Sequence, residues 1–284
     1  MTSSVSPTTL IKVESGKVRD EQDILAVEEP LEIRIGFGPK QEREQKSLAV
    51  TMRTPGYDLE LSLGFLYSEG IIQNFEQVKS IEHCEDLGRQ EEAGNVVRVE
   101  LTSDLSFDLK RLQRNFYTTS SCGVCGKTSI EAVEQACQVH SAAKIELSEY
   151  LIHELPEMLR KAQRVFNHTG GLHASGLFDA DGELQLVRED VGRHNALDKL
   201  IGAAVFQGQI PLNEHVVVLS GRISFELVQK AMMAGLPIIV AVGAPSSLAV
   251  DLAKKADITL VGFTRESRFN VYTGKDRISF QSDR

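Results

Sequence analysis

The sequence predicts an α/β protein whose second half contains a mostly parallel sheet with helices on both faces. Two observations lead to this prediction. Short, continuous apolar segments recur after residue 210, and segments with helical periodicity separate them. Continuous apolar strands that alternate with helices are typical of a parallel sheet buried on both faces. The predicted strands cover residues 215–219, 237–242 and 258–261, and the helices between them cover 225–234 and 247–255.

The first half of the chain predicts a smaller mixed α+β region. Residues 31–35 and 47–52 alternate apolar and polar side chains, as half-buried strands do, and 95–101 predicts a further strand. A helix is predicted over 58–66, with Gly70 as its stop signal.

Two more helices are predicted between these regions. One runs from near Pro156 to about residue 166, because proline is tolerated in the first turn of a helix. The other is amphipathic and follows a charge-rich block at 188–196, in which Asp190 is a candidate helix cap. Its apolar face comprises Leu197, Leu200, Ile201 and Ala204.

The composition is that of an ordinary globular protein. The 284 residues are 42% hydrophobic and 25% charged, and the net charge of −9 disfavours nucleic-acid binding. No apolar run approaches the roughly eighteen residues of a membrane span. Four cysteines are too few for a disulfide framework in a chain of this length, so we expect a cytoplasmic protein.

The polar residues 1–28 predict a flexible tail, followed by the mixed region at 29–150 and the α/β region at 151–284.

A small, polar, glycine-bearing loop at 118–128 carries two thiols, Cys122 and Cys125. A following helix N-terminus and Lys127 both favour the reactive thiolate form. Sulfur chemistry therefore competes here with a zinc site, a thioredoxin-type redox pair and an inert pair. A zinc site usually needs four ligands, and no second Cys-x-x-Cys or His-x-x-x-His motif is present, so we expect no metal.

Three loops follow the predicted parallel strands, at 220–222, 243–247 and 262–268. Ligands of such sheets bind beyond the carboxyl ends of the strands. The loops carry arginines and hydroxyls and lead into two helix N-termini, which suits a phosphate or a nucleotide. Ordinary turn chemistry remains the alternative, since Gly, Ser and Pro occur in loops of every kind.

Two polar segments, at 167–174 and 188–196, contain His173 and His194. Taken singly, each histidine is better explained as a structural residue with satisfied hydrogen bonds. Neither segment has a His-Glu-x-x-His motif, and the zinc deaminase signature is also missing.

Taken together and in order, these motifs resemble those of the FdhD family of sulfur carriers, the formate dehydrogenase accessory proteins. The resemblance covers about residue 30 to Thr273. It rests on Ser-Cys-Gly-Val-Cys-Gly at 121–126, Thr-Gly-Gly-Leu-His-Ala at 169–174, Arg-Glu-Asp-Val-Gly-Arg-His-Asn-Ala at 188–196, Leu-Ser-Gly-Arg at 219–222 and Gly-Phe-Thr-Arg-Glu-Ser-Arg-Phe-Asn-Val-Tyr-Thr at 262–273.

The resemblance implies a sulfurtransferase that accepts a persulfide from a cysteine desulfurase and sulfurates the molybdenum bis(guanine dinucleotide) cofactor of formate dehydrogenase. It places the persulfide on Cys122, with Cys125 as the second loop cysteine, and GDP would mimic the cofactor. It also implies a homodimer and a second domain similar to the cytidine-deaminase α/β/α fold. The expected cofactor contacts are Ser220, Gly221, Arg222, Phe263, Thr264, Arg265, Glu266, Ser267 and Arg268.

Two other functions remain open at this point. A thiol–disulfide oxidoreductase would use Cys122 and Cys125 as its redox pair. A noncatalytic chaperone would bind the cofactor and dock to the dehydrogenase without carrying sulfur.

Overall fold

The structure is a computed structural model that describes residues 3–84, 94–105 and 145–280. The loop with Cys122 and Cys125, and the helix predicted after it, lie outside these residues.

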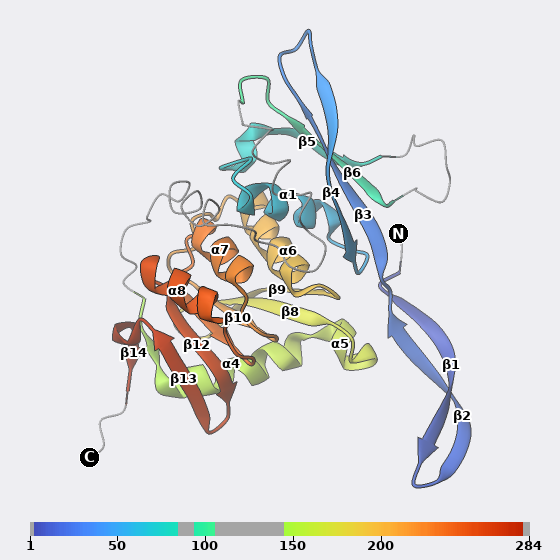
Figure 1. Ribbon diagram of the computed structural model, residues 1–284, viewed down its shortest axis with the longest axis vertical. Helices are drawn as coiled ribbons and strands as arrows, with labels where there is room; N and C mark the ends of the chain where they lie inside the picture. Colours follow the sequence, from blue (N-terminus) through green and yellow to red (C-terminus); the bar gives the residue numbers. More distant parts are fainter. Residues whose placement is uncertain (1–2, 85–93, 106–144, 281–284) are drawn as a thin grey trace.

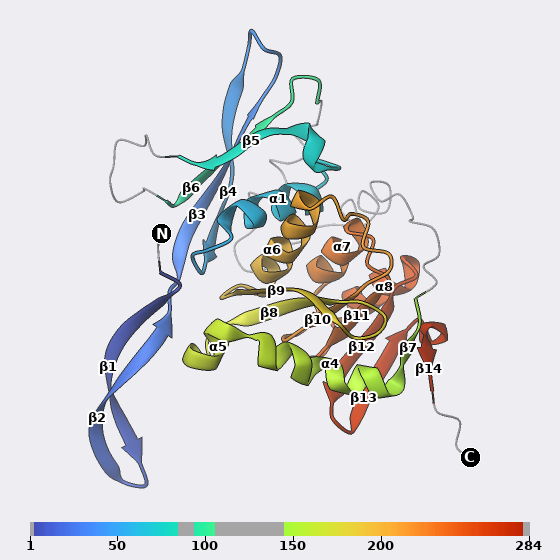
Figure 2. The same ribbon diagram turned by 180° about the vertical axis from the view of Figure 1, so that it is seen from behind.

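The centre of the protein is a six-stranded sheet in the order β13-β12-β11-β10-β8-β9 (Figures 1 and 2). The strands are β8 (His173–Phe178), β9 (Leu184–Asp190), β10 (Val216–Leu219), β11 (Ile238–Ala241), β12 (Thr259–Arg265) and β13 (Arg268–Thr273). In this sheet only the neighbouring pairs β10–β11 and β11–β12 are parallel, and the other three neighbouring pairs are antiparallel. The prediction of a mostly parallel sheet is therefore wrong, because β8–β9 and β12–β13 are joined by short loops that connect only antiparallel strands.

Helices cover both faces of this sheet, as predicted. Helix α4 (Glu149–Ala162) lies on one face, and α6 (Arg193–Phe206), α7 (Phe225–Met233) and α8 (Ser247–Lys255) lie on the other (Figure 2). In strand β10, successive side chains point to opposite faces of the sheet. Val216 and Val218 pack with α4, whereas Val217 and Leu219 belong to the core on the opposite face.

Two predicted helices differ from the observed ones. Helix α4 starts at Glu149, after the N-cap Ser148, whose hydroxyl accepts a hydrogen bond from the Leu151 amide at 3.1 Å. Pro156 therefore lies inside the helix and not near its start. A separate helix α5 (Arg164–Thr169) follows. Helix α6 is buried almost throughout, from Asn195 to Val205, instead of being amphipathic.

The first-half region matches its predicted strands and helix. Its sheet has the order β4-β3-β6-β5 and is backed by α1. The bounds are β3 (Glu29–Phe37), β4 (Glu44–Arg53), α1 (Asp58–Ser68), η1 (Phe75–Gln77), β5 (Val78–His83) and β6 (Val96–Leu101).

The two regions share one core because α1 packs directly on α6 (Figure 1). Glycines make this contact close. A Cβ at Gly64 would lie 1.8 Å from the Asp198 carbonyl oxygen, and one at Gly202 would lie 1.8 Å from that of Glu60. Any side chain larger than hydrogen would separate the helices at this crossing.

The first residues of the chain do not form the predicted tail. Strands β1 (Val5–Glu14) and β2 (Lys17–Ala26) instead form a β-hairpin that extends from the body (Figure 1). Its two-residue turn has positive φ at Ser15 (51°) and Gly16 (80°), the conformation that suits a tight hairpin. Near the other terminus, η3 (Lys275–Arg277) precedes β14 (Ile278–Ser279), which pairs with β7 (Leu147–Ser148). Among the described residues, no helix is long and apolar enough to cross a membrane.

Candidate functional site at the carboxyl edge of the sheet

The three predicted loops meet at one edge of the central sheet and are hydrogen-bonded to each other. The Gly243 amide donates to the Gly221 carbonyl at 3.0 Å, and the Phe263 amide donates to the Gly243 carbonyl at 3.1 Å. The Ile223 amide donates to the Ala244 carbonyl at 3.0 Å. The parallel arrangement of β10, β11 and β12 brings these loops together, which confirms the sequence prediction of a shared edge.

Glycine is required where the loops cross. A Cβ at Gly243 would lie 2.6 Å from the Gly221 carbonyl oxygen and 2.8 Å from the Arg222 Cα. Both of these are backbone atoms, which cannot move aside as a flexible side chain can. The edge is therefore a tightly packed backbone platform with side chains projecting from it.

The predicted contact residues are not equally accessible. Arg222, Phe263, Arg265 and the residues of the β12–β13 turn, Glu266, Ser267 and Arg268, are exposed, while Ser220 and Gly221 are partly exposed. Thr264 is fully buried, and its hydroxyl has no hydrogen-bond partner within the described part of the chain. Its side chain is therefore closed to a solute in this conformation.

Phe263 and Arg265 are held in defined conformations. Phe263 has a φ of 54°, which is unusual for an aromatic residue, and its side chain remains 42% exposed. Such local strain is concentrated at functional sites. Arg265 Nη1 donates to the Val242 and Thr264 carbonyls at 2.8 Å each, so this arginine also ties β12 to the neighbouring loop.

Three residues at the same edge were not predicted as site residues: His173, Arg193 and His194. Strand β8 runs antiparallel to β10 and starts at this edge, while α6 starts here after β9. A Cβ on Gly221 would lie 3.2 Å from His173 Nδ1, so the imidazole packs against the 220–222 loop. His194 Nε2 lies 3.0 Å from Ser224 Oγ at the start of α7.

Both imidazoles are held neutral near neutral pH. Burial lowers the pKa of His194 to about 4, and the positive charges of Arg193 and Lys230 act in the same direction. Burial also lowers the pKa of His173, again assisted by Arg193 and by Arg222, while Asp190 opposes the shift. Arg193 thus acts electrostatically on both histidines.

The rest of the 188–196 block supports the fold. Arg188 forms two hydrogen bonds with the Glu60 carboxylate, at 2.5 and 2.8 Å. The Glu189 carboxylate accepts from the Val165 and Phe166 amides in the first turn of α5.

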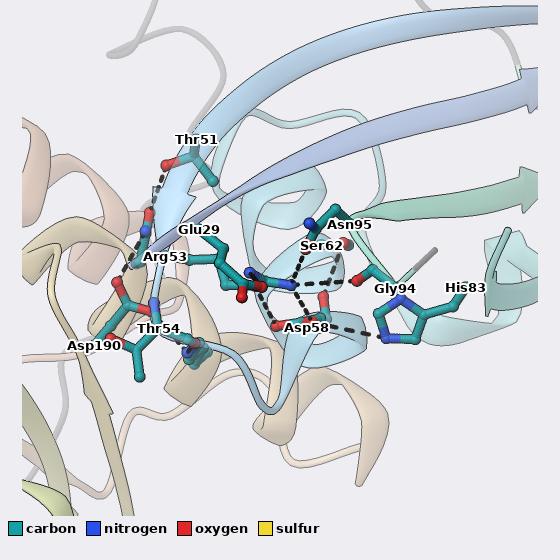
Figure 3. Close-up of polar contacts among 12 residues, drawn as sticks. Glu29, Thr51, Arg53, Thr54, Asp58, Ser62, His83, Gly94, Asn95 and Asp190 are labelled. Carbon is teal, nitrogen blue, oxygen red and sulfur yellow. Dashed lines mark hydrogen bonds and ion pairs between the residues drawn. The ribbon is translucent and has the colours of Figure 1, made fainter. Parts of the chain in front are cut away.

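Asp190 is not the helix cap that the sequence suggests. It is the last residue of β9, and the N-cap of α6 is Gly192. The Asp190 carboxylate lies 2.6 Å from Lys199 Nζ and accepts from the Thr54 amide at 3.1 Å, which ties β9 to the end of β4 (Figure 3). Asn195 continues this connection, because its Nδ2 donates to the Met52 carbonyl at 2.8 Å.

A second buried group of charges stands beside this contact in the first-half region (Figure 3). Arg53 is fully buried and donates to both Asp58 carboxylate oxygens at 3.0 Å. It also bonds Glu29 and Asn95, so it joins β4, α1, β3 and the loop before β6. Within the described residues, no group of three or more His, Cys, Asp or Glu side chains is arranged to hold a metal ion.

Comparison with known proteins gives a consistent family. The model of the FdhD/NarQ family matches residues 26–279. The sulfur carrier protein FdhD of Mycolicibacterium paratuberculosis is 50% identical over 266 residues, covering 93% of this chain and 95% of that protein. The FdhD protein of Streptomyces coelicolor is 47% identical over 278 residues, with 96% and 95% covered, and that of Sulfolobus acidocaldarius is 45% identical over 267 residues, with 94% and 96% covered.

A crystal structure from Desulfotalea psychrophila, assigned as a formate dehydrogenase accessory protein, shares the fold. Its TM-score is 0.72 at 24% identity, with 97% of this chain and 99% of that chain covered.

Proposed function

Because the chain belongs to the FdhD/NarQ family, we propose that it is a sulfur carrier that serves the maturation of formate dehydrogenase. The family match over residues 26–279 carries this proposal, and the curated relatives that bear the name sulfur carrier protein supply its chemistry.

Cys122 is the proposed carrier, in a loop outside the described residues. Its thiolate attacks the terminal sulfur of a persulfide on a cysteine desulfurase. A new sulfur–sulfur bond forms on Cys122, the old one breaks, and the desulfurase leaves as its thiolate. The molybdenum bis(guanine dinucleotide) cofactor is the acceptor substrate that receives this sulfur from Cys122.

The carboxyl edge of the central sheet is the proposed binding site of that acceptor. A dinucleotide offers diphosphates and flat bases. Arg222, Arg265 and Arg268 suit the diphosphates, since a guanidinium fork matches phosphate oxygens. The exposed ring of Phe263 suits a base. Thr264 contributes through its backbone only, because its side chain is buried.

The carrier step is tested by incubating the protein with a cysteine desulfurase and cysteine, followed by peptide mass spectrometry. We expect one added sulfur on Cys122 and none on Cys84, which is partly buried at the end of β5. Cys84→Ser is the control and should load normally, whereas Cys122→Ala should not load. Sulfur on Cys84 with an unmodified Cys122 would refute the assignment.

Thiol–disulfide oxidoreductase activity and activation of formate dehydrogenase, measured on cysteine variants beside the loading assay, separate the alternative functions. Cys125→Ala would remove the resolving thiol of a thiol–disulfide oxidoreductase, whereas a persulfide carrier would keep some loading of Cys122. Cys122→Ala would still activate formate dehydrogenase if the protein were a noncatalytic chaperone.

Acceptor binding is tested separately with GDP as the cofactor mimic. Removing one charged hydrogen-bond partner costs about 1.5–3 kcal/mol, so Arg265→Ala should weaken GDP binding roughly ten- to a hundredfold. The variant should still load sulfur on Cys122. Arg164→Ala, at an exposed position in α5, is the matched control. Unchanged GDP affinity in a folded Arg265→Ala protein would count against this site.

A further inference from the structure

A group of polar residues at the carboxyl edge has no role in the contacts proposed so far. It consists of His173, Arg193, His194 and Ser224, which come from β8, α6 and the start of α7. His173 packs on the 220–222 loop, so the group adjoins the proposed nucleotide site.

Several hydrogen-bonding groups here lack protein partners. Arg193 Nε is buried and has no hydrogen-bond partner within the described residues. Ser224 is the N-cap residue of α7, but its hydroxyl forms its hydrogen bond with His194 Nε2 and none with the first amides of the helix. The N-cap of α6 is Gly192, which has no side chain to offer. The N-termini of α6 and α7 therefore lie close to the unpartnered Nε of Arg193, and neither helix is capped by the side chain of its own N-cap residue.

The register of α6 and α7 fixes this arrangement. Asp198 lies one turn after His194 on α6, and Lys230 lies one turn after Glu226 on α7. The Lys230 Nζ and the Asp198 carboxylate are 2.8 Å apart, and both side chains are buried. The Ser68 hydroxyl of α1 donates to the same Asp198 carboxylate at 3.0 Å. The pair locks the two helices so that His194 and Ser224 stay opposite each other.

Charge favours an anion as the occupant. His194 faces the positive groups Arg193 and Lys230, with the Glu226 carboxylate 3.9 Å from its Nε2 and His173 nearby. His173 faces Arg193 and Arg222, with Asp190 as the opposing charge. A neutral imidazole keeps one N–H group, with which it can donate one hydrogen bond to an anion. The His194 side chain is 36% exposed, so a solute can reach it.

We propose that Arg193, His173 and His194 form an anion subsite beside the 220–222 loop, and that it binds the diphosphate group of a nucleotide. Arg193 and Arg222 then flank the diphosphate, and the first amides of α7 complete its contacts. The proposal rests on the proposed function for the identity of the nucleotide, but not for the binding of inorganic diphosphate.

The test uses the full chain and inorganic diphosphate as the probe. Calorimetry should show binding that Arg193→Gln weakens at least tenfold, while Arg193→Lys weakens it less because the charge remains. Arg164→Gln should leave the affinity unchanged. The histidine ring resonances, assigned with His173→Asn and His194→Asn, should titrate at higher pH when diphosphate is bound, because a nearby anion favours the protonated ring.

Two results would overturn the subsite. One is an unchanged diphosphate affinity in Arg193→Gln that keeps the thermal midpoint of the wild type. The other is a set of histidine resonances that do not respond to diphosphate, or that respond equally to the same concentration of sulfate. Sulfur loading of Cys122 is measured in parallel. A failure to load would refute the proposed function while leaving diphosphate binding interpretable, and normal loading without diphosphate binding would refute the subsite alone.

Discussion

The buried contact between Asp190 and Lys199 gives the most quantitative prediction. The two side chains are 0% and 1% exposed, and their charged atoms lie 2.6 Å apart. The Asp190 carboxylate also accepts from the Thr54 amide at 3.1 Å, the Gly192 amide at 2.8 Å and Asn195 Nδ2 at 3.0 Å. Asp190→Ala removes all four interactions and leaves the ammonium of Lys199 buried without its counter-charge.

Removing one partner of a buried ion pair costs about 3–5 kcal/mol, because the remaining charge is left uncompensated. The lost amide contacts lie in the same network, so their costs do not simply add. We therefore expect the free energy of unfolding to fall by about 3–5 kcal/mol. That is a large part of the roughly 5–15 kcal/mol that stabilises a typical domain.

Urea unfolding of the wild type and of the variants measures this loss. Asp251→Ala, at an exposed position on α8, is the control and should stay within about 0.5 kcal/mol of the wild type. The double variant Asp190→Asn with Lys199→Met should recover part of the loss, since it removes the orphaned charge. A loss below about 1 kcal/mol in Asp190→Ala would refute the reasoning.

The remaining predictions concern the helix crossing and the site histidine. Gly202→Ala should lower the free energy of unfolding by at least about 1–3 kcal/mol, because its Cβ would lie 1.8 Å from the Glu60 carbonyl oxygen. Gly171→Ala is the control, because its Cβ would lie 3.8 Å from the nearest atom, the Ala26 Cβ. Thermal unfolding should show little change in the stability of this control. The pKa of His194 is lowered to about 4 from an unfolded value near 6.5, so the folded state binds fewer protons between these values. Stability from this group is present above pH 6.5 and is lost as the pH falls towards 4. Denaturation curves at a series of pH values should show a shallower decline for His194→Gln, and parallel curves would contradict the neutral assignment.

The sequence predicted well those elements whose burial is uniform. The strands at 216–219 and 238–241 are apolar throughout because helices cover both of their faces. Strand β8 escaped prediction because it contains His173, Ser175 and Gly176, which are poor strand signals. The structure explains Gly176, since a Cβ there would lie 2.8 Å from Leu159 Cδ1 in α4.

The site was predicted only as far as the parallel strands determine it. Loops that follow parallel neighbours share an edge, so Arg222 and Arg265 could be placed from sequence. His173 and Arg193 could not, because their position depends on β8 pairing antiparallel with β10. The available signal was a polar block next to paired glycines, which indicates importance without indicating a location.

The block at 188–196 contains residues that stabilise the fold and residues of the proposed anion subsite. Its first three residues end a strand and bond outward to α1, α5 and α6, while Asn195 bonds β4. Arg193 and His194 follow in the first turn of α6, after the N-cap residue Gly192, and His194 Nε2 lies 3.0 Å from Ser224 Oγ at the start of α7. The block therefore places residues that stabilise the fold next to residues of the proposed anion subsite. A variant at Asp190 should act on unfolding, whereas a variant at Arg193 should act on anion affinity with the fold intact. Because α6 also packs on α1 through Gly202, the first-half region helps to determine where these two side chains stand.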